Sequence, residues 1–189
     1  MHDHPIAAGR SSYDLIDKAK LFSVFTPMPG QAVLDLACGI GNYSLPVAER
    51  VGAGGKVYGL DIWAEGVDTL QRRAGEMNLS NISAVVADAK YPFPLESKSL
   101  DWCLMATVFH DFVEISIEEN VSREVARLLK PEGKLAIIEF KKIEGPPGPL
   151  LHIRLSREEV DDFLSPFGFQ LEKTEDIGPY HYLSIYGGV

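Results

Sequence analysis

Five short apolar runs recur along the chain, separated by stretches with helical spacing, and this alternation restricts the fold more than any other feature. The runs are rich in β-branched residues and almost continuously apolar, as strands are when both faces of a parallel sheet are covered. We expect strands at 32–37, 56–61, 83–88, 100–107 and 135–140. The alternation predicts a three-layer, doubly wound α/β domain.

The remaining segments complete this expected architecture. Amphipathic patterns predict helices at about 12–25, 42–51, 64–77 and 115–130, the last ended by Pro131. In "SREE", Ser156 is placed to cap another helix, and Glu159 completes a capping box. The segments 169–177 and 180–187 are expected to pair as an antiparallel hairpin. We divide the chain into an N-terminal helical cap, 1–30, and one globular domain, 31–189.

Charge and cysteine content exclude several classes of protein. The net charge is −9, and Lys and Arg are scattered, whereas a general nucleic-acid binder clusters them. No apolar run is long enough to span a bilayer, and the N-terminus lacks the layout of a signal peptide. Cys38 and Cys103 lie in apolar runs without metal-type spacing. We therefore expect a cytoplasmic protein with no metal site, no nucleic-acid partner and no membrane insertion.

The turn after the first strand, "AVLDLACGIGNY", carries the most informative motif. A dinucleotide fingerprint would place three glycines where this chain has Ala37, Gly39 and Asn42, so two of them are missing. Gly39 and Gly41 still allow the backbone to approach a ligand closely. The acid before them, Asp35, opposes a phosphate and favours a cation. S-adenosylmethionine fits, because it carries an ammonium and a sulfonium group and no phosphate.

Two more acids end the next two strands. Asp61 ends the second strand, where a carboxylate can accept from both ribose hydroxyls. Ile62 follows it and can cover one face of an adenine. Asp88 ends the third strand and can accept from the adenine amine, while the backbone N–H of Ala89 serves a ring nitrogen. Three acids at three consecutive strand ends predict a nucleoside site.

The motifs "VLDLACGIGNYS", "VYGLDI", "VVADAKYPFPLESKSLDWCLM" and "EVARLLKPEGKLAIIEF" resemble the successive motifs of class I S-adenosylmethionine-dependent methyltransferases. The resemblance covers nearly the whole chain and is closest to the ubiquinone and menaquinone biosynthesis group, among small prokaryotic members of unassigned substrate. It implies a seven-stranded Rossmann-like sheet whose last strand is antiparallel. It also implies S-adenosylmethionine as donor and S-adenosylhomocysteine as product.

Carried over by position, the resemblance assigns a donor site. It places four residues around the methionine moiety: Asp35, Ala37 (a glycine in most of the family), Gly39 and Gly41. It assigns Asp61 to the ribose, and Asp88 with Ala89 to the adenine. At the end of the fourth strand, it places the backbone of Ala106 and Thr107 beside the sulfonium and the amino group of the donor. "DLID" after "GRSSY" resembles a helix that covers the donor, which makes Tyr13 a lid contact.

The acceptor side leaves several alternatives open. His110 is a general base, a residue that orients substrate, or a loop anchor beside Asp111. Glu139 either binds substrate or anchors the "KK" loop by a salt bridge. We expect some apolar residues at the pocket mouth, where they would contact a small acceptor or a second subunit of a homodimer: Phe109, Phe112, Pro146, Leu150 and Leu151. Four polar residues lie either at this mouth or on the solvated surface: His152, Arg154, Tyr180 and His181.

Three functions compete on this basis. The leading one is methyl transfer from S-adenosylmethionine to a small-molecule acceptor by in-line displacement. The second is a non-catalytic protein that only binds S-adenosylmethionine. The third is a nucleotide-dependent oxidoreductase, which Asp35 and the missing glycines disfavour.

Overall fold

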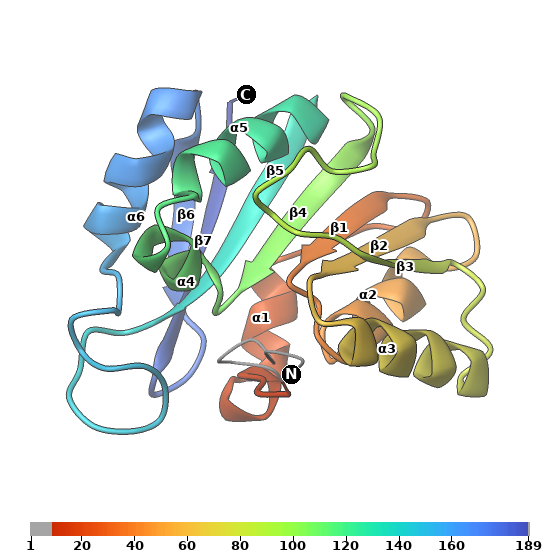
Figure 1. Ribbon diagram of the computed structural model, residues 1–189, viewed down its shortest axis with the longest axis horizontal. Coiled ribbons are helices and arrows are strands. Elements are labelled where there is room, and N and C mark those ends of the chain that lie inside the picture. Colours follow the sequence, from red (N-terminus) through yellow and green to blue (C-terminus); the bar gives the residue numbers. More distant parts are fainter. Residues whose placement is uncertain (1–8, 189) are drawn as a thin grey trace.

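The computed structural model describes residues 9–188 and shows a seven-stranded sheet in the order β3-β2-β1-β4-β5-β7-β6 (Figure 1). The strands are β1 (Ala32–Leu36), β2 (Lys56–Asp61), β3 (Ile82–Val86), β4 (Leu100–Ala106), β5 (Leu129–Phe140), β6 (Gln170–Asp176) and β7 (His181–Gly187). β1 to β5 pair in parallel, and β7 pairs antiparallel to β5 and β6. The predicted doubly wound sheet and its C-terminal hairpin are confirmed.

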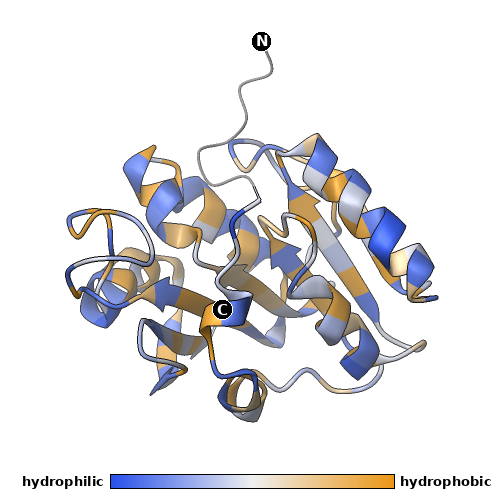
Figure 2. Cartoon of the chain, turned by 90° about the horizontal axis from the view of Figure 1, so that it is seen from below, coloured by the Kyte–Doolittle hydropathy of each residue, from blue (hydrophilic) through white to orange (hydrophobic). Residues whose placement is uncertain are grey.

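Helices cover both faces of this sheet. One face carries α1 (Lys18–Val24), α2 (Ser44–Val51) and α3 (Ala64–Glu76), and the other carries α4 (Phe109–Glu114), α5 (Glu118–Leu128) and α6 (Arg157–Leu164). Side chains of β1 alternate between the layers, since Val33 packs with α1 and α2 while Leu34 and Leu36 pack with α4 and α5. Figure 2 shows the hydrophobic positions gathered on the strands and on the helix faces turned toward them.

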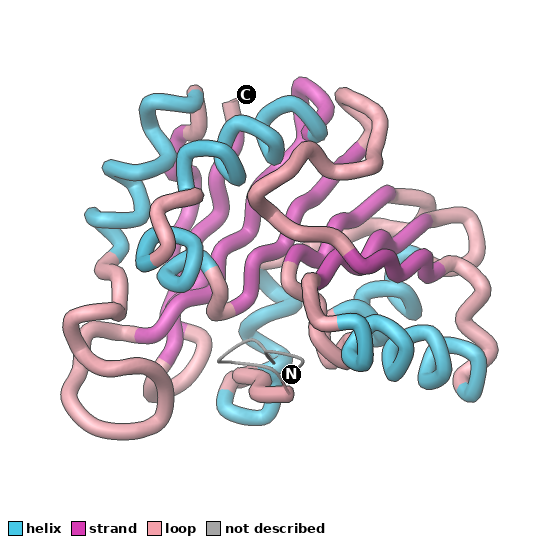
Figure 3. The backbone as a smooth tube through the Cα atoms, viewed as in Figure 1, coloured by secondary structure: helices cyan, strands magenta, loops and turns pink. Residues whose placement is uncertain are grey.

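The chain enters α6 through the predicted capping box. Ser156 Oγ accepts from the Glu159 backbone N–H at 3.2 Å, and Glu159 Oε2 accepts from the Ser156 backbone N–H at 2.7 Å. Two backbone donors at the helix start are thereby satisfied. Before α6 runs a long connection from β5, drawn as a loop in Figure 3.

The predicted helix at 12–25 is interrupted. It is split into a single 3-10 turn, η1 (Tyr13–Leu15), and the short α1. The break lies at Asp17, whose backbone N–H donates to the Ile177 carbonyl at 2.6 Å while its side chain caps α1. The N-terminal segment therefore joins the loop between β6 and β7. Leu21 and Phe25 are fully buried, and the Phe25 ring meets Trp102 edge-on at 5.0 Å.

The predicted helix at 115–130 is present but shorter. It is α5, which runs from Glu118 to Leu128, and β5 starts at Leu129 although Pro131 follows. Leu129 pairs with Leu100 at the start of β4, and a register shift between Leu100 and Trp102 absorbs the bend. A Cβ at Gly133 would lie 2.9 Å from the Leu100 carbonyl oxygen, so the close approach requires glycine.

Among residues 9–188, no helix combines the length and apolarity that crossing a membrane requires.

Candidate functional site

The carboxyl ends of the parallel strands meet at one edge of the sheet, the lower edge in Figure 1. Ligands of doubly wound folds bind at this edge. The sequence-predicted site residues follow or end β1, β2, β3, β4 and β5, so the fold gathers them there. Two groups form along the edge, one around β1 and β2 and the other around β4 and β5.

The loop between β1 and α2 owes its shape to left-handed backbone. φ is +62° at Ala37, +52° at Gly39 and +82° at Gly41. At Gly41 a Cβ would lie 2.2 Å from the Leu70 side chain, so this position requires glycine for space as well as for conformation. Ala37 donates its N–H to the Leu60 carbonyl at 2.7 Å, which bends the chain toward β2.

Asp35 lies beneath this loop with 3% of its surface exposed. Its Oδ2 accepts from Ser44 Oγ, at the start of α2, at 2.5 Å. Burial and, to a smaller extent, the Asp61 charge raise the pKa of Asp35 to about 7, against the opposing effect of the Ser44 hydrogen bond. A cation bound beside this carboxyl would favour its ionised form.

Asp61 connects β2 to the same loop. Its Oδ2 accepts from the Gly39 N–H at 2.7 Å and its Oδ1 from the Trp63 N–H at 2.8 Å. Each carboxylate oxygen has a second lone pair, so the group can still accept from ligand hydroxyls. The next residue, Ile62, is 54% exposed.

The third predicted acid lies one strand farther along the sheet. Asp88 follows β3, is partly exposed, and accepts from the Lys90 N–H at 2.9 Å. Ala89 beside it is also partly exposed. The structure thus brings Asp35 and Asp61 to one loop and places Asp88 beyond them.

The N-terminal segment crosses the edge between the two groups of residues. Ser12 is buried, and its Oγ lies 2.8 Å from the Tyr43 hydroxyl and 3.2 Å from Thr107 Oγ1. Tyr13, predicted as a lid contact, meets the Tyr43 ring edge-on at 4.9 Å and has Lys18 Nζ 4.3 Å from its ring centre. Sequence reasoning missed Ser12, because a serine in "GRSSY" carries no signal of a contact so distant in sequence.

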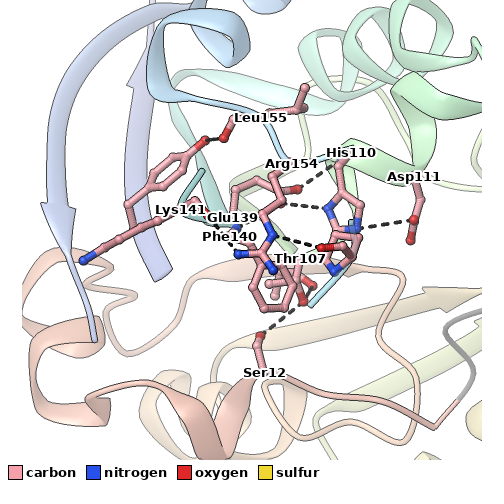
Figure 4. Close-up of polar contacts among 12 residues, drawn as sticks. Ser12, Thr107, His110, Asp111, Glu139, Phe140, Lys141, Arg154 and Leu155 are labelled. Atoms are coloured by element: carbon pink, nitrogen blue, oxygen red, sulfur yellow. Dashed lines mark hydrogen bonds and ion pairs between the residues drawn. The ribbon is translucent and has the colours of Figure 1, made fainter. Parts of the chain in front are cut away.

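After β4 the chain bends in the same way as after β1. Ala106 ends the strand, and Thr107 has φ +55° and donates its N–H to the Ile138 carbonyl at 2.7 Å. His110 follows in the first turn of α4, a helix where we expected a short loop. Glu139 is fully buried, and its Oε2 lies 2.7 Å from His110 Nδ1 (Figure 4).

The expected salt bridge between Glu139 and the "KK" loop is absent from the described structure. Lys141 pairs with Asp176, and Lys142 pairs with Glu159, both at 2.6 Å. These pairs are partly exposed, so each contributes little to stability. The side-chain partner of Glu139 is therefore His110 and not a lysine of this loop.

The loop after β5 is organised by one buried cation. Arg154 is 2% exposed and donates to five carbonyl oxygens, those of Lys141, Ile143, Gly145, Pro147 and Pro149. Its guanidinium has five N–H groups, which matches this number. Arg154 is thus a structural residue of the loop and not part of a solvated surface.

Of the other residues expected at the pocket mouth, some are buried in the core and others are exposed on the surface. Phe109 and Phe112 are buried in the core against α5 and α6, so the prediction that they line the mouth is wrong. Leu150 and Leu151 are exposed on the loop that Arg154 organises. His181 is fully buried, and its ring lies 4.4 Å from the Phe140 ring centre.

The strand order, the glycine loop after β1 and the acids at the strand ends define a Rossmann-like methyltransferase fold. A solved S-adenosylmethionine-dependent methyltransferase from Aquifex aeolicus superposes with a TM-score of 0.85 and 29% identity, over 94% of this chain and 93% of that one. Residues 33–133, more than half of the chain, match the family described as methyltransferase domain. The chain belongs to this family.

Two curated relatives have a similar sequence. A 2-phytyl-1,4-naphtoquinone methyltransferase of Trichormus variabilis is 34% identical over 60% of this chain and 48% of its own length. A demethylmenaquinone methyltransferase of Lactobacillus johnsonii is 29% identical over 88% of this chain and 64% of its own. The chain therefore spans about half to two thirds of the length of these relatives.

Proposed function

We propose that the protein transfers a methyl group from S-adenosylmethionine to a small-molecule acceptor. Family membership and the likeness to the Aquifex aeolicus enzyme support this function. The observation that carries it is the pair of carboxylates, Asp35 and Asp61, on either side of the glycine loop. The nearby cation Arg73 donates through Nη1 to the Ile40 carbonyl and to Asn42 Oδ1, at 2.7 and 2.8 Å.

In this proposal the donor lies along the ends of β1 to β4. Asp35 and the backbone of Ala37, Gly39 and Gly41 hold the methionine moiety, and the lone pairs left on Asp61 accept from the ribose hydroxyls. A second group of residues completes the site: Ile62, Asp88 and Ala89 for the adenine, and Ala106 and Thr107 for the backbone beside the sulfonium. Tyr13 and the N-terminal cap, predicted at 1–30, form the cover; residues 1–8 of this cap lie outside the described residues.

The bound donor supplies an activated methyl group, and the protein holds the donor and the acceptor in the geometry that transfer requires. In-line displacement requires the nucleophile about 3–3.5 Å from the methyl carbon. The ends of β4 and β5 lie beside the donor loop, so the acceptor is held between them. One relative is named as a 2-phytyl-1,4-naphtoquinone methyltransferase and the other as a demethylmenaquinone methyltransferase, which supports a ring-bearing acceptor here. The exposed Leu150 and Leu151 serve either this acceptor or a second subunit.

The two thiols support a reducing compartment, and we propose the cytoplasm. Cys38 and Cys103 are both buried and unbonded to each other. Burial raises the pKa of both thiols, which keeps them protonated and unreactive.

Calorimetry tests the donor site directly. Titration with S-adenosylhomocysteine should release heat with one-site stoichiometry, and titration with NAD should not. Radiolabelled S-adenosylmethionine and a panel of hydroquinone, phenol and thiol acceptors then test transfer. Heat from NAD alone would refute the assignment. Heat from S-adenosylhomocysteine with no labelled product from any acceptor would favour the non-catalytic binder.

A further inference from the structure

The geometry points to His110 as the proton acceptor of the transfer reaction and to Glu139 as the residue that positions it. The two residues come from neighbouring strands, His110 following β4 on α4 and Glu139 lying near the end of β5. The inference rests on the proposed methyl transfer and adds the step by which the acceptor loses its proton.

Glu139 is built into the fold as a hydrogen-bond acceptor. Its oxygens receive the His110 backbone N–H at 3.1 Å, the Phe140 backbone N–H at 3.3 Å and the ring nitrogen His110 Nδ1 at 2.7 Å. A fully buried carboxylate is stable as an ion only with such donors around it. Because an ionised carboxylate can only accept, Nδ1 must carry the ring hydrogen. The lone pair of the neutral imidazole is then on Nε2.

Nε2 is not committed to a strong hydrogen bond. Among the described residues, its ionic neighbour is Asp111 Oδ1 at 3.4 Å, which is longer than a normal hydrogen bond (Figure 4). The Asp111 side chain is 40% exposed, so it connects this nitrogen to water. Glu139 thus holds the Nδ1 side of the ring, and Nε2 keeps a lone pair that can receive a proton and release it.

The charges around His110 favour its protonated form. Burial alone would lower the pKa of His110, but the charge and the hydrogen bond of Glu139 raise it above its ordinary value. Asp111 and Glu114, both on α4, raise it further. The Phe140 ring also has two other neighbours, the guanidinium of Arg154, 5.7 Å from the ring centre, and the ring of His181.

His181 shows what burial does without a bonded carboxylate. It is as buried as His110, yet neither of its nitrogens has a hydrogen-bond partner in the described structure. Burial lowers its pKa to about 4, so it stays neutral near pH 7. The structure therefore holds two buried imidazoles around Phe140, and Glu139 makes only one of them basic.

The step balances with the groups named. The acceptor gives a hydroxyl or acidic carbon proton to His110 Nε2, and the freed electron pair forms the bond to the methyl carbon. The bond from methyl carbon to sulfur breaks, and its electron pair stays on sulfur. One positive charge is lost at sulfur and one appears on the imidazole. The ring then returns its proton to water past Asp111.

Acceptors of different acidity test the base. With 1,4-naphthalenediol, which must lose a proton, His110→Ala should lower turnover at least about 100-fold. With a nitrated phenol, at a pH where it is already ionised, the same variant should keep turnover within about threefold of wild type. S-adenosylhomocysteine affinity should not change in either case. An equal loss with both acceptors, or no loss with the diol, would overturn the role.

The interaction between His110 and Glu139 can be tested without a methyl acceptor. In a pH titration of the ¹⁵N-labelled imidazoles by NMR, neutral wild-type His110 should carry its hydrogen on Nδ1. Glu139→Gln should lower the pKa of His110 by at least about one unit. The matched control is Glu175→Gln, a change to an exposed carboxylate on β6, which should leave that pKa unchanged.

Turnover with the diol should show the same change. Turnover requires unprotonated Nε2, so the rise of turnover with pH should move to lower pH in Glu139→Gln while the plateau falls. A His110 pKa equal in wild type and Glu139→Gln would overturn the inference. A wild-type protein that fails to bind S-adenosylhomocysteine would refute the proposed function alone, since the NMR titration would still decide the pair.

Discussion

The two halves of the carboxyl edge use carboxylates in different ways. Around β1 and β2, Asp61 bonds to backbone N–H groups and Asp35 bonds to the hydroxyl of Ser44. Around β4 and β5, Glu139 accepts from two backbone N–H groups and also bonds to a side chain that can carry a proton, the imidazole of His110. The first half shapes a backbone cradle and the second orients a reactive group.

This difference separates recognition from chemistry. A cradle made by backbone suits one constant ligand, the proposed donor, and depends on glycines and turns more than on particular side chains. The half around β4 and β5 depends on side chains and on the loop that Arg154 holds, so it can vary with the acceptor. Changes in one half should therefore leave the function of the other half intact.

The largest expected effect comes from removing the carboxylate of Asp61. Asp61→Ala leaves the N–H groups of Gly39 and Trp63 without their acceptor and also removes the proposed ribose contact. We expect a loss of about 3 kcal/mol in donor binding, or about 100-fold in the dissociation constant of S-adenosylhomocysteine. Calorimetry measures this loss.

The comparison predicts that the His110–Glu139 pair is unaffected by this change. The pKa of His110 from NMR should match wild type in Asp61→Ala. Asp68→Ala, an exposed change on α3, serves as control and should bind the ligand normally. A shifted pKa of His110 would show that the two halves are coupled.

The next prediction concerns the other half of the edge, where the change is made in the loop after β5. Arg154→Lys keeps the positive charge but has three donors for five carbonyl oxygens. We expect faster amide hydrogen exchange over residues 141–153 and an acceptor KM raised about tenfold. The affinity for S-adenosylhomocysteine should stay within about twofold of wild type. Equal losses at donor and acceptor would contradict the separation of the two halves.

The sequence predicted the half around β1 and β2 better than the half around β4 and β5. The strand ends and glycines that lie beside each acid in the sequence suffice to place Asp35 and Asp61 around one loop, although the two acids belong to different strands. The pairing of Glu139 with His110 spans 29 residues and depends on α4, a short helix that the apolar pattern did not reveal. Ser12 was missed for the same reason, since its partner Thr107 lies 95 residues away.

A smaller effect is the pH dependence of donor binding. In the ligand-free protein Asp35 has a pKa near 7, whereas an Asp in the unfolded chain has about 3.8. The folded state therefore holds an extra proton between these values, and the stability that this proton contributes is lost as pH rises toward 7. A cationic donor requires the carboxylate, so binding near pH 6 should release about one proton and tighten as pH rises.

Calorimetry in two buffers of different ionisation enthalpy measures this proton. The apparent binding enthalpy of S-adenosylmethionine should differ between the buffers for wild type and agree for Asp35→Asn. The half around β4 and β5 gives an internal comparison, because Glu139→Gln should leave the released proton in place. Equal enthalpies for wild type in both buffers would show that Asp35 does not titrate on binding.

The smallest effect compares the two left-handed residues that follow β1 and β4. Ala37 and Thr107 have nearly the same φ, +62° and +55°, and each costs about 1 kcal/mol of backbone strain. Ala37→Gly relieves this strain, but the glycine makes the unfolded chain more flexible, so we expect a gain of about 0.5 kcal/mol in unfolding free energy. Thr107→Gly relieves the same strain but loses the hydrogen bonds of Oγ1 to Ser12 and to the Ala106 carbonyl. Urea denaturation should therefore place Thr107→Gly below Ala37→Gly by about 1 kcal/mol, and equal stabilities would mean that the contact between Ser12 and Thr107 contributes nothing.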